Sequence, residues 1–204
     1  MPRLEKITAA GALALRADVT DQASVHGALA RVAADRGHVD LVVNAASAYG
    51  GPRSGPFGGG PIAETSADAF DSWAVAPARS AFAFLSGAAS FLVAQGRAAT
   101  AIQVTGGSSR RAMPGRGLWA AGAFGVRAIT QAAALELRGQ GIHVALLIVD
   151  AGIEPVRATT APANREAMAD PRQIAEAVRF LADQGSRAAT HELQVTPLAE
   201  TWVP

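Results

Sequence analysis

The chain has 204 residues, half of them hydrophobic, which is the size of one domain with an ample core. Its formal net charge of +1 gives no general field for nucleic acid or an anionic membrane, so we expect neither as a partner. The lack of cysteine excludes disulfides, thiolate zinc sites and a cysteine nucleophile, and we expect no metal. With neither a signal-like start nor a run of about 18 uncharged apolar residues, we expect a cytoplasmic protein.

The first part of the chain predicts alternating helices and strands. Residues 2–10 are typical of a short helix and residues 12–19 of a strand. Thr20 is expected to cap a second helix, which Gly37 ends. Residues 39–43 then predict a second strand, because their apolar side chains are bounded by turn residues.

Residues 48–61 predict a loop. Nine of these fourteen residues are Gly or Pro, so we expect neither helix nor strand there. A phosphate cradle needs the spacing Gly-x-Gly-x-x-Gly between a strand and a helix, and that spacing occurs nowhere in the sequence. We therefore interpret the stretch as a mobile loop over the sheet, with a lid over a site as the alternative.

The middle of the chain predicts a long helix and then a strand. Ser66 is the expected cap, and Pro77 should kink or break the helix because proline lacks an N–H. The helix should continue over residues 79–93, and residues 99–104 should form a strand.

The last third predicts a second long helix and two further strands. Residues 105–138 combine a strand end, a loop rich in Gly, Pro and Arg, and a helix. Residues 142–149 form an almost uninterrupted apolar run, as a parallel strand buried on both faces requires. A helix beginning at Asp170 and a strand over residues 191–195 follow. The alternation predicts an α/β fold, a three-layer parallel sheet with helices on both faces, in a single domain over residues 1–204.

The stretch 105–138 resembles the active-site segment of the short-chain dehydrogenase/reductase family, in which a strand ends in Ser and the following helix opens with Tyr-x-x-x-Lys. Pro114 and the glycine after it fall on the family's loop Pro-Gly. The Ser, Tyr and Lys positions, however, are Gly106, Trp119 and Ala123. Pro77 falls on the family's helix Asn, which holds a water in the proton relay. The resemblance therefore implies the fold without its catalytic groups.

Hydride transfer at a carbinol carbon needs a proton donor or acceptor at the oxygen. The Trp119 indole donates a hydrogen bond but does not titrate, and Ala123 has no polar group. The chain has a single Tyr, Tyr49, and a single Lys, Lys6, which lie in different expected elements. We interpret Trp119 and Ala123 as packing residues of an amphipathic helix.

The resemblance also assigns vestigial cofactor-binding positions, namely Asp18, Val19, Asn44, Ala46 and Gly152. It begins at what looks like the family's second helix, so the Rossmann-like sheet is expected to lack the first βαβ elements and their glycine-rich pyrophosphate turn. The alternatives are a naturally shortened relative and a misplaced start. We expect no cofactor and no saturable NAD(H) or NADP(H) binding in the micromolar range.

Three functional hypotheses follow. The first is a degenerate homologue that binds a small molecule or a partner subunit, forms a homo-oligomer and transfers no hydride. The alternative is an NAD(P)-dependent oxidoreductase that uses Tyr49, Ser108 and Ser109. The third is a non-redox enzyme, for which Asp150 and Glu154 supply carboxylates.

The family's strand order also predicts the shape of the shortened sheet. Two absent strands would lie between residues 12–19 and residues 39–43. An open apolar edge is avoided by soluble proteins. We therefore expect residues 12–19 to pair directly with residues 39–43 in a sheet of about five strands, or a second chain to cover the edge. Residues 198–202 resemble the C-terminal end of one bacterial branch of the family.

Overall fold

The computed structural model describes residues 11–46, 55–155 and 165–200. Four parallel strands form one sheet in the order β1-β2-β3-β4. Their bounds are Leu41–Asn44 for β1, Ala99–Gly106 for β2, Ile142–Val149 for β3 and Glu192–Val195 for β4. The predicted parallel α/β sheet is confirmed, and the carboxyl ends of its strands meet at one edge.

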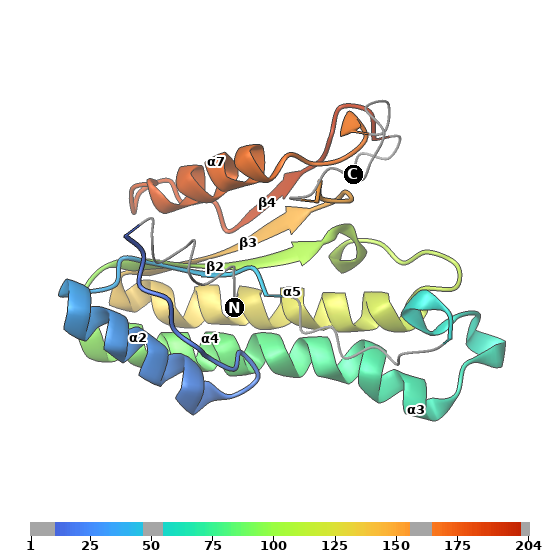
Figure 1. Ribbon diagram of the computed structural model, residues 1–204, viewed down its shortest axis with the longest axis horizontal. Helices are drawn as coiled ribbons and strands as arrows, with labels where there is room; N and C mark the ends of the chain where they lie inside the picture. Colours follow the sequence, from blue (N-terminus) through green and yellow to red (C-terminus); the bar gives the residue numbers. More distant parts are fainter. Residues whose placement is uncertain (1–10, 47–54, 156–164, 201–204) are drawn as a thin grey trace.

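Helices cover both faces of the sheet (Figure 1). One face is covered by three helices, α2 (Gln22–Arg36), α4 (Ala76–Gln95) and α5 (Gly117–Leu137). The other face is covered by α7 (Pro171–Ala182). The short elements are α3, Ala67–Phe70, a π-helical turn, Asp71–Val75, and 3-10 turns at Phe57–Gly59, Ile62–Glu64, Gly107–Ser109 and Arg138–Gln140. The three-layer arrangement is as predicted.

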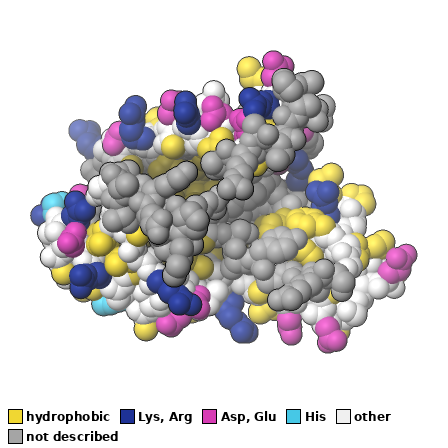
Figure 2. Space-filling view, viewed as in Figure 1, with side chains coloured by type: hydrophobic (Ala, Val, Ile, Leu, Met, Phe, Trp, Pro, Cys, Tyr) yellow, Lys and Arg dark blue, Asp and Glu magenta, His cyan; other side chains and the backbone are white. Residues whose placement is uncertain are grey.

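The face of the molecule shown in Figure 2 carries both signs of charge. In the view of Figure 2, basic and acidic side chains alternate around the periphery instead of gathering by sign. One helical stretch, Ala67–Gln95, is long and apolar enough to cross a membrane by composition, and half of its most apolar window is buried in the protein. The same stretch packs against α2 and α5, as the core helix of a globular domain does.

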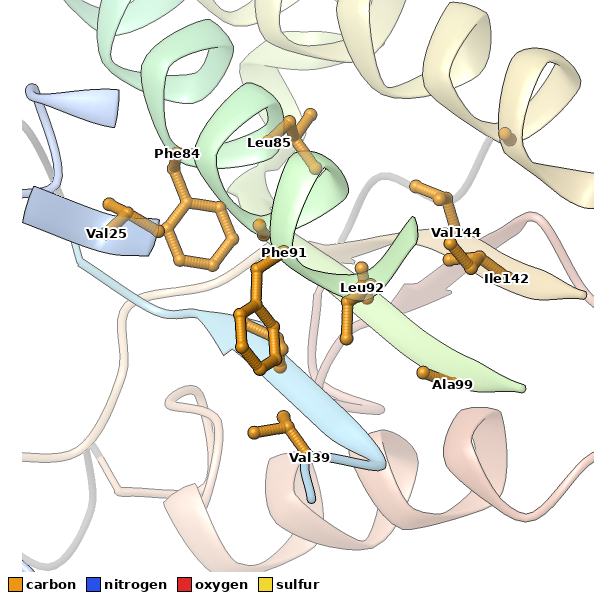
Figure 3. Packing of buried hydrophobic residues seen from close by; sticks show 13 residues of the cluster. Val25, Val39, Phe84, Leu85, Phe91, Leu92, Ala99, Ile142 and Val144 are labelled. Atoms are coloured by element: carbon orange, nitrogen blue, oxygen red, sulfur yellow. The ribbon is translucent and has the colours of Figure 1, made fainter. Parts of the chain in front are cut away.

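The core forms where α2 and α4 pack on the sheet. In Figure 3, Phe84 of α4 lies beside Val25 of α2, and Phe91 of α4 points toward Val39, just before β1; all four are buried. Burying one side chain of this size contributes roughly 1.5–3 kcal/mol. These contacts fix α4 against the sheet and so position the residues at the sheet's carboxyl edge.

The predicted strand at residues 12–19 is wrong, and with it the direct pairing to residues 39–43 and the five-stranded sheet. This segment runs alongside α2 (Figure 1), held by hydrogen bonds near both ends of that helix. Arg36 donates to the Gly11 carbonyl at 3.2 Å, and the Asp18 N–H donates to Ser24 Oγ at 2.8 Å. Local bonds to the helix thus replace sheet pairing, and within the described residues no strand pairs with the outer edge of β1.

The start of α2 also differs from the prediction. Asp21, one residue after Thr20, is the N-cap, and its carboxylate accepts from Ala23 N and Ser24 N. Carboxylate caps satisfy the free N–H groups of the first turn as hydroxyl caps do. Gly37 ends the helix as predicted, with a φ of 94°.

Pro77 does not break the helix, and the turn that precedes it is π-helical. Asp71–Val75 is π-helical and leads directly into α4, so the two segments stay continuous. Pro77 has no N–H for the Trp73 carbonyl four residues earlier. That carbonyl faces Gly122 of α5, where a Cβ would lie 2.7 Å from the oxygen. The glycine therefore allows α5 to approach the proline-adjusted turn closely.

The Gly/Pro-rich stretch is not free of helix. Phe57–Gly59 forms a 3-10 turn, which corrects the expectation of a wholly irregular loop, while residues 47–54 lie outside the described residues. Gly58 has a φ of 80°, and a Cβ there would lie 2.9 Å from the Arg116 backbone. Glycine thus permits both the turn and its close packing on the start of α5.

Candidate functional site

A pocket of about 280 Å³ lies beyond the carboxyl ends of β1, β2 and β3, between the sheet and the helices α4 and α5. This is where ligands bind in open parallel α/β sheets. Its described lining is Asn44, Ala45, Ala46, Pro77, Ser80, Ala81, Gln103, Val104, Thr105, Gly106, Trp119, Ala123, Val126, Val149, Ala151 and Ile153.

The four family catalytic positions meet in this pocket. Pro77, Gly106, Trp119 and Ala123 come from α4, β2 and α5, and all four line it. Trp119 and Ala123 lie one helical turn apart on α5. None of these side chains exchanges a proton near neutral pH. The structure therefore brings together the four residues that the family resemblance aligned with catalytic positions.

Trp119 also belongs to an aromatic cluster beside the pocket. Its ring centroid is 5.3 Å from that of Phe57 and 5.9 Å from that of Trp73. The Arg116 guanidinium lies 5.4 Å above the Phe57 ring. Tilted and edge-to-face pairs at these distances stabilise packing beyond their buried area. The contacts agree with the interpretation of Trp119 as a packing residue.

The two amides of the pocket bind each other. Asn44 Nδ2 donates to Gln103 Oε1 at 2.9 Å, and Asn44 Oδ1 accepts from Ala46 N at 3.2 Å. Gln103 Nε2 donates to the Val104 carbonyl at 2.9 Å. Both side chains are buried. Their hydrogen bonds tie the ends of β1 and β2 together, so the amides serve mainly to hold the wall of the pocket.

Ser80 was missed from the sequence. It lies on α4, it is 3% exposed, and among the described residues its hydroxyl has no hydrogen-bond partner. Thr130, similarly buried on α5, instead donates to the carbonyl four residues earlier at 2.8 Å. A serine within an otherwise apolar helix face is the signal that could have identified it.

Asp150 and Glu154, proposed as acid-base carboxylates, are both held in ion pairs. Arg111 binds Asp150 through two nitrogens, at 2.5 and 3.2 Å, and Gln194 Nε2 adds a contact at 3.3 Å. Arg165 lies 3.0 Å from Glu154. Neither carboxylate lines the pocket. The structure thus places the two groups in structural pairs outside the site.

The residues named for an unorthodox oxidoreductase are not brought to the pocket either. Ser109 is fully buried, and its hydroxyl donates to the Gly106 carbonyl at 2.9 Å. Ser108 is partly buried and, like Ser109, is absent from the lining. Tyr49 lies outside the described residues.

The vestigial cofactor positions are divided. Asn44 and Ala46 line the pocket, whereas Asp18, Val19 and Gly152 do not. The Asp18 carboxylate is exposed, and hydrogen bonds from the Thr20 hydroxyl and then the Thr20 N–H lower its pKa. Among the described residues, the lining of this pocket has no charged side chain. The part of the chain that is described also holds no cluster of three metal-ligating side chains.

A parallel sheet covered by helices, with a pocket beyond the carboxyl ends of its strands, defines a Rossmann-type α/β protein. The chain belongs to the short-chain dehydrogenase/reductase family of this class. The sequence model described as enoyl-(acyl carrier protein) reductase matches residues 2–195. The matched range covers all four strands of the sheet.

Solved structures agree on the fold. A short-chain dehydrogenase from Rhodopseudomonas palustris is 25% identical, with a TM-score of 0.70 over 96% of this chain and 80% of that one. One from Mycobacterium avium is also 25% identical, with a TM-score of 0.72 over 98% and 69%. An alcohol dehydrogenase from Thermococcus sibiricus, solved with 5-hydroxy-NADP, is 20% identical, with a TM-score of 0.71 over 100% and 85%.

A curated relative is much longer than this chain. The glycine betaine reductase ATRR of Emericella nidulans is 24% identical over 208 residues. The match covers 96% of this chain and 16% of the relative.

Proposed function

We propose that this family member is a pseudoenzyme that binds a small molecule or a partner subunit and transfers no hydride. The observation that carries the proposal is the meeting of Gly106, Trp119 and Ala123 in one pocket. In the family, a Tyr hydroxyl whose pKa is lowered by a nearby Lys normally protonates the substrate oxygen. The Trp119 indole and the Ala123 methyl group supply neither the acid nor the cation. Loss of general acid-base catalysis alone costs roughly 10²–10⁴-fold in rate.

The proposal includes the loss of the dinucleotide. Affinity for such a cofactor comes largely from backbone N–H groups and a helix N-terminus around the pyrophosphate. The sequence carries no Gly-x-Gly-x-x-Gly turn, and the described lining of the pocket is uncharged. With neither feature available, we expect weak and unsaturable binding of NAD(H) and NADP(H).

The alternative is an NAD(P)-dependent oxidoreductase acting with other residues. Family membership favours it, but the hydroxyl of Ser109 is engaged by Gly106 and Ser108 lies outside the pocket lining. The non-redox hypothesis is weaker still, because Arg111 and Arg165 hold the carboxylates of Asp150 and Glu154.

One experiment separates these functions. Thermal unfolding is followed with and without NADH and NADPH, and nicotinamide absorbance is followed with generic ketone and alcohol substrates. The pseudoenzyme predicts an unchanged melting temperature and no turnover. A dinucleotide-dependent rise in melting temperature with turnover would support the oxidoreductase, and a rise without turnover would leave a cofactor-binding protein.

We further propose that the protein is a cytoplasmic homo-oligomer without nucleic-acid or membrane partners. A groove between α4 and α5 is bordered by Phe82, 52% exposed, and Val93, 40% exposed. A second copy of the chain is the occupant proposed for this apolar surface. Light scattering with size-exclusion chromatography tests this, with Phe82→Glu expected to give monomers.

A further inference from the structure

We propose that the pocket at the carboxyl edge of the sheet binds a small, uncharged and largely apolar molecule with one polar group, which hydrogen-bonds Ser80. This inference rests on the proposed function, because an active enzyme would fill the same space with cofactor and substrate. It adds the chemical class of the ligand and the residue that orients it.

The lining determines the charge of the ligand. The side chains that face the space are mostly Ala, Val, Pro, Ile and Trp, and the described lining holds no Asp, Glu, Lys or Arg. A charged ligand would lose its hydration here without gaining an opposite charge, which is strongly unfavourable. A neutral ligand loses little hydration free energy on entering the pocket, and its apolar surface gains contact with Trp119, Val126 and Val149.

The volume determines the size of the ligand. The space of about 280 Å³ is nearly twice the roughly 150 Å³ of an apolar cavity known to hold benzene. A molecule of about two fused rings therefore fits. The Trp119 indole is fixed by Phe57 and Trp73, so it provides a rigid wall.

Ser80 determines the polar contact. A buried helix serine normally donates to the carbonyl four residues earlier, as Thr130 does. The Ser80 hydroxyl makes no such bond among the described residues. Its oxygen is not one of the fully enclosed unpaired atoms, so it stays accessible on the lining of the pocket. A ligand hydroxyl or carbonyl at this point would give it a hydrogen-bond partner, and Thr105 lies on the same lining.

The probe is 2-naphthol, a neutral two-ring molecule with one hydroxyl, titrated calorimetrically into the full chain. We expect saturable binding, weaker binding of naphthalene, and no binding of 2-naphthoate, whose carboxylate is charged. Binding of 2-naphthoate equal to that of 2-naphthol would overturn the charge argument. No saturable binding of 2-naphthol would overturn the proposal as a whole.

Three variants locate the binding. Ser80→Ala removes the hydroxyl and should weaken the binding of 2-naphthol about three- to tenfold, while the affinity for naphthalene stays unchanged. Ala123→Leu fills the pocket and should abolish binding of both, with circular dichroism showing that the fold is kept. The matched control is Ser86→Ala on the same helix, since Ser86 lines the α4–α5 groove instead. Equal loss in Ser80→Ala and Ser86→Ala, or unchanged binding in Ala123→Leu, would contradict the assignment.

The two proposals fail differently. Turnover of NADH or NADPH by the wild-type protein would overturn the proposed function whatever 2-naphthol does. Absence of both turnover and 2-naphthol binding would overturn only the ligand assignment.

Discussion

The carboxylate of Asp150 occupies the space that a Cβ at Gly107 would need. Its two oxygens and its carboxyl carbon are the nearest atoms to that position. The close approach brings the end of β3 onto the turn after β2, where Arg111 pairs with the carboxylate. Gly107 lies next to Gly106, the residue aligned with the family's Ser, and it thus has a structural role in this chain.

Gly107→Ala should therefore destabilise the protein. The new methyl group must displace Asp150 and break its bonds to Arg111, which we expect to cost about 2–3 kcal/mol. This is less than the 3–5 kcal/mol of a fully buried pair because the Arg111 side chain is 22% exposed. Urea unfolding measures the change.

Gly139→Ala is the matched control, since a Cβ there meets nothing within 4 Å. In an Asp150→Ala background, Gly107→Ala should cost much less, because the displaced group is gone. Equal costs in both backgrounds would contradict the steric explanation.

Gly122→Ala should separate α5 from the π-helical turn. Its Cβ would lie 2.7 Å from the Trp73 carbonyl oxygen and 3.0 Å from that of Ala74, so one element must move. We expect a loss of about 1–3 kcal/mol in the free energy of unfolding, despite the higher helix propensity of alanine. Gly27→Ala on α2 meets nothing within 4 Å and should stabilise by roughly 0.5–1 kcal/mol. A change of the same sign in the free energy of unfolding for both variants would refute this account of the contact.

The elements that could be predicted are those whose own residues determine them. The apolar run Ile142–Val149 forms β3 at the predicted bounds, and Asp170 caps α7 as expected. Residues 12–19 carry a strand-like pattern with Leu13 and Leu15, but a strand also needs a partner edge. Bonds to α2 hold this segment instead, and both leucines are 38% exposed.

The site was predictable where the family pattern supplied a frame. Gly106, Trp119 and Ala123 do meet in one pocket. The Arg111–Asp150 pair was not predicted, because the two residues are 39 positions apart and no local pattern links them. The sequence also does not show which groups form hydrogen bonds with a serine on a helix. The unpaired hydroxyl of Ser80 could therefore be identified only from the structure.

Restoring the family residues should not restore the activity. The variant Gly106→Ser, Trp119→Tyr, Ala123→Lys is expected to fold, with a loss of about 1–2 kcal/mol from the aromatic cluster. It should show no dehydrogenase turnover, because nothing in the described lining positions a dinucleotide. Nicotinamide absorbance with generic alcohols measures this, and clear turnover would show that the cofactor site is intact.

Thr20→Val should raise the pKa of Asp18. The Thr20 hydroxyl is the main cause of the lowered pKa, and the Thr20 N–H remains to hold it partly below the ordinary 3.8. A lowered folded-state pKa contributes stability above the unfolded value, and this contribution is lost as the pH falls below 3.8 through the folded pKa. Carboxyl NMR titration measures the shift, with Thr20→Ser as the control that keeps the hydroxyl. An identical Asp18 titration in wild type and Thr20→Val would refute the assigned cause.

We propose that this chain keeps the family's fold without its cofactor binding and acid-base chemistry. Calorimetric titration of the full chain with NADH and with NADPH tests it most directly. The account predicts heats no larger than those of dilution and no saturable binding in the micromolar range. A saturable isotherm of micromolar or tighter affinity for either dinucleotide would contradict it.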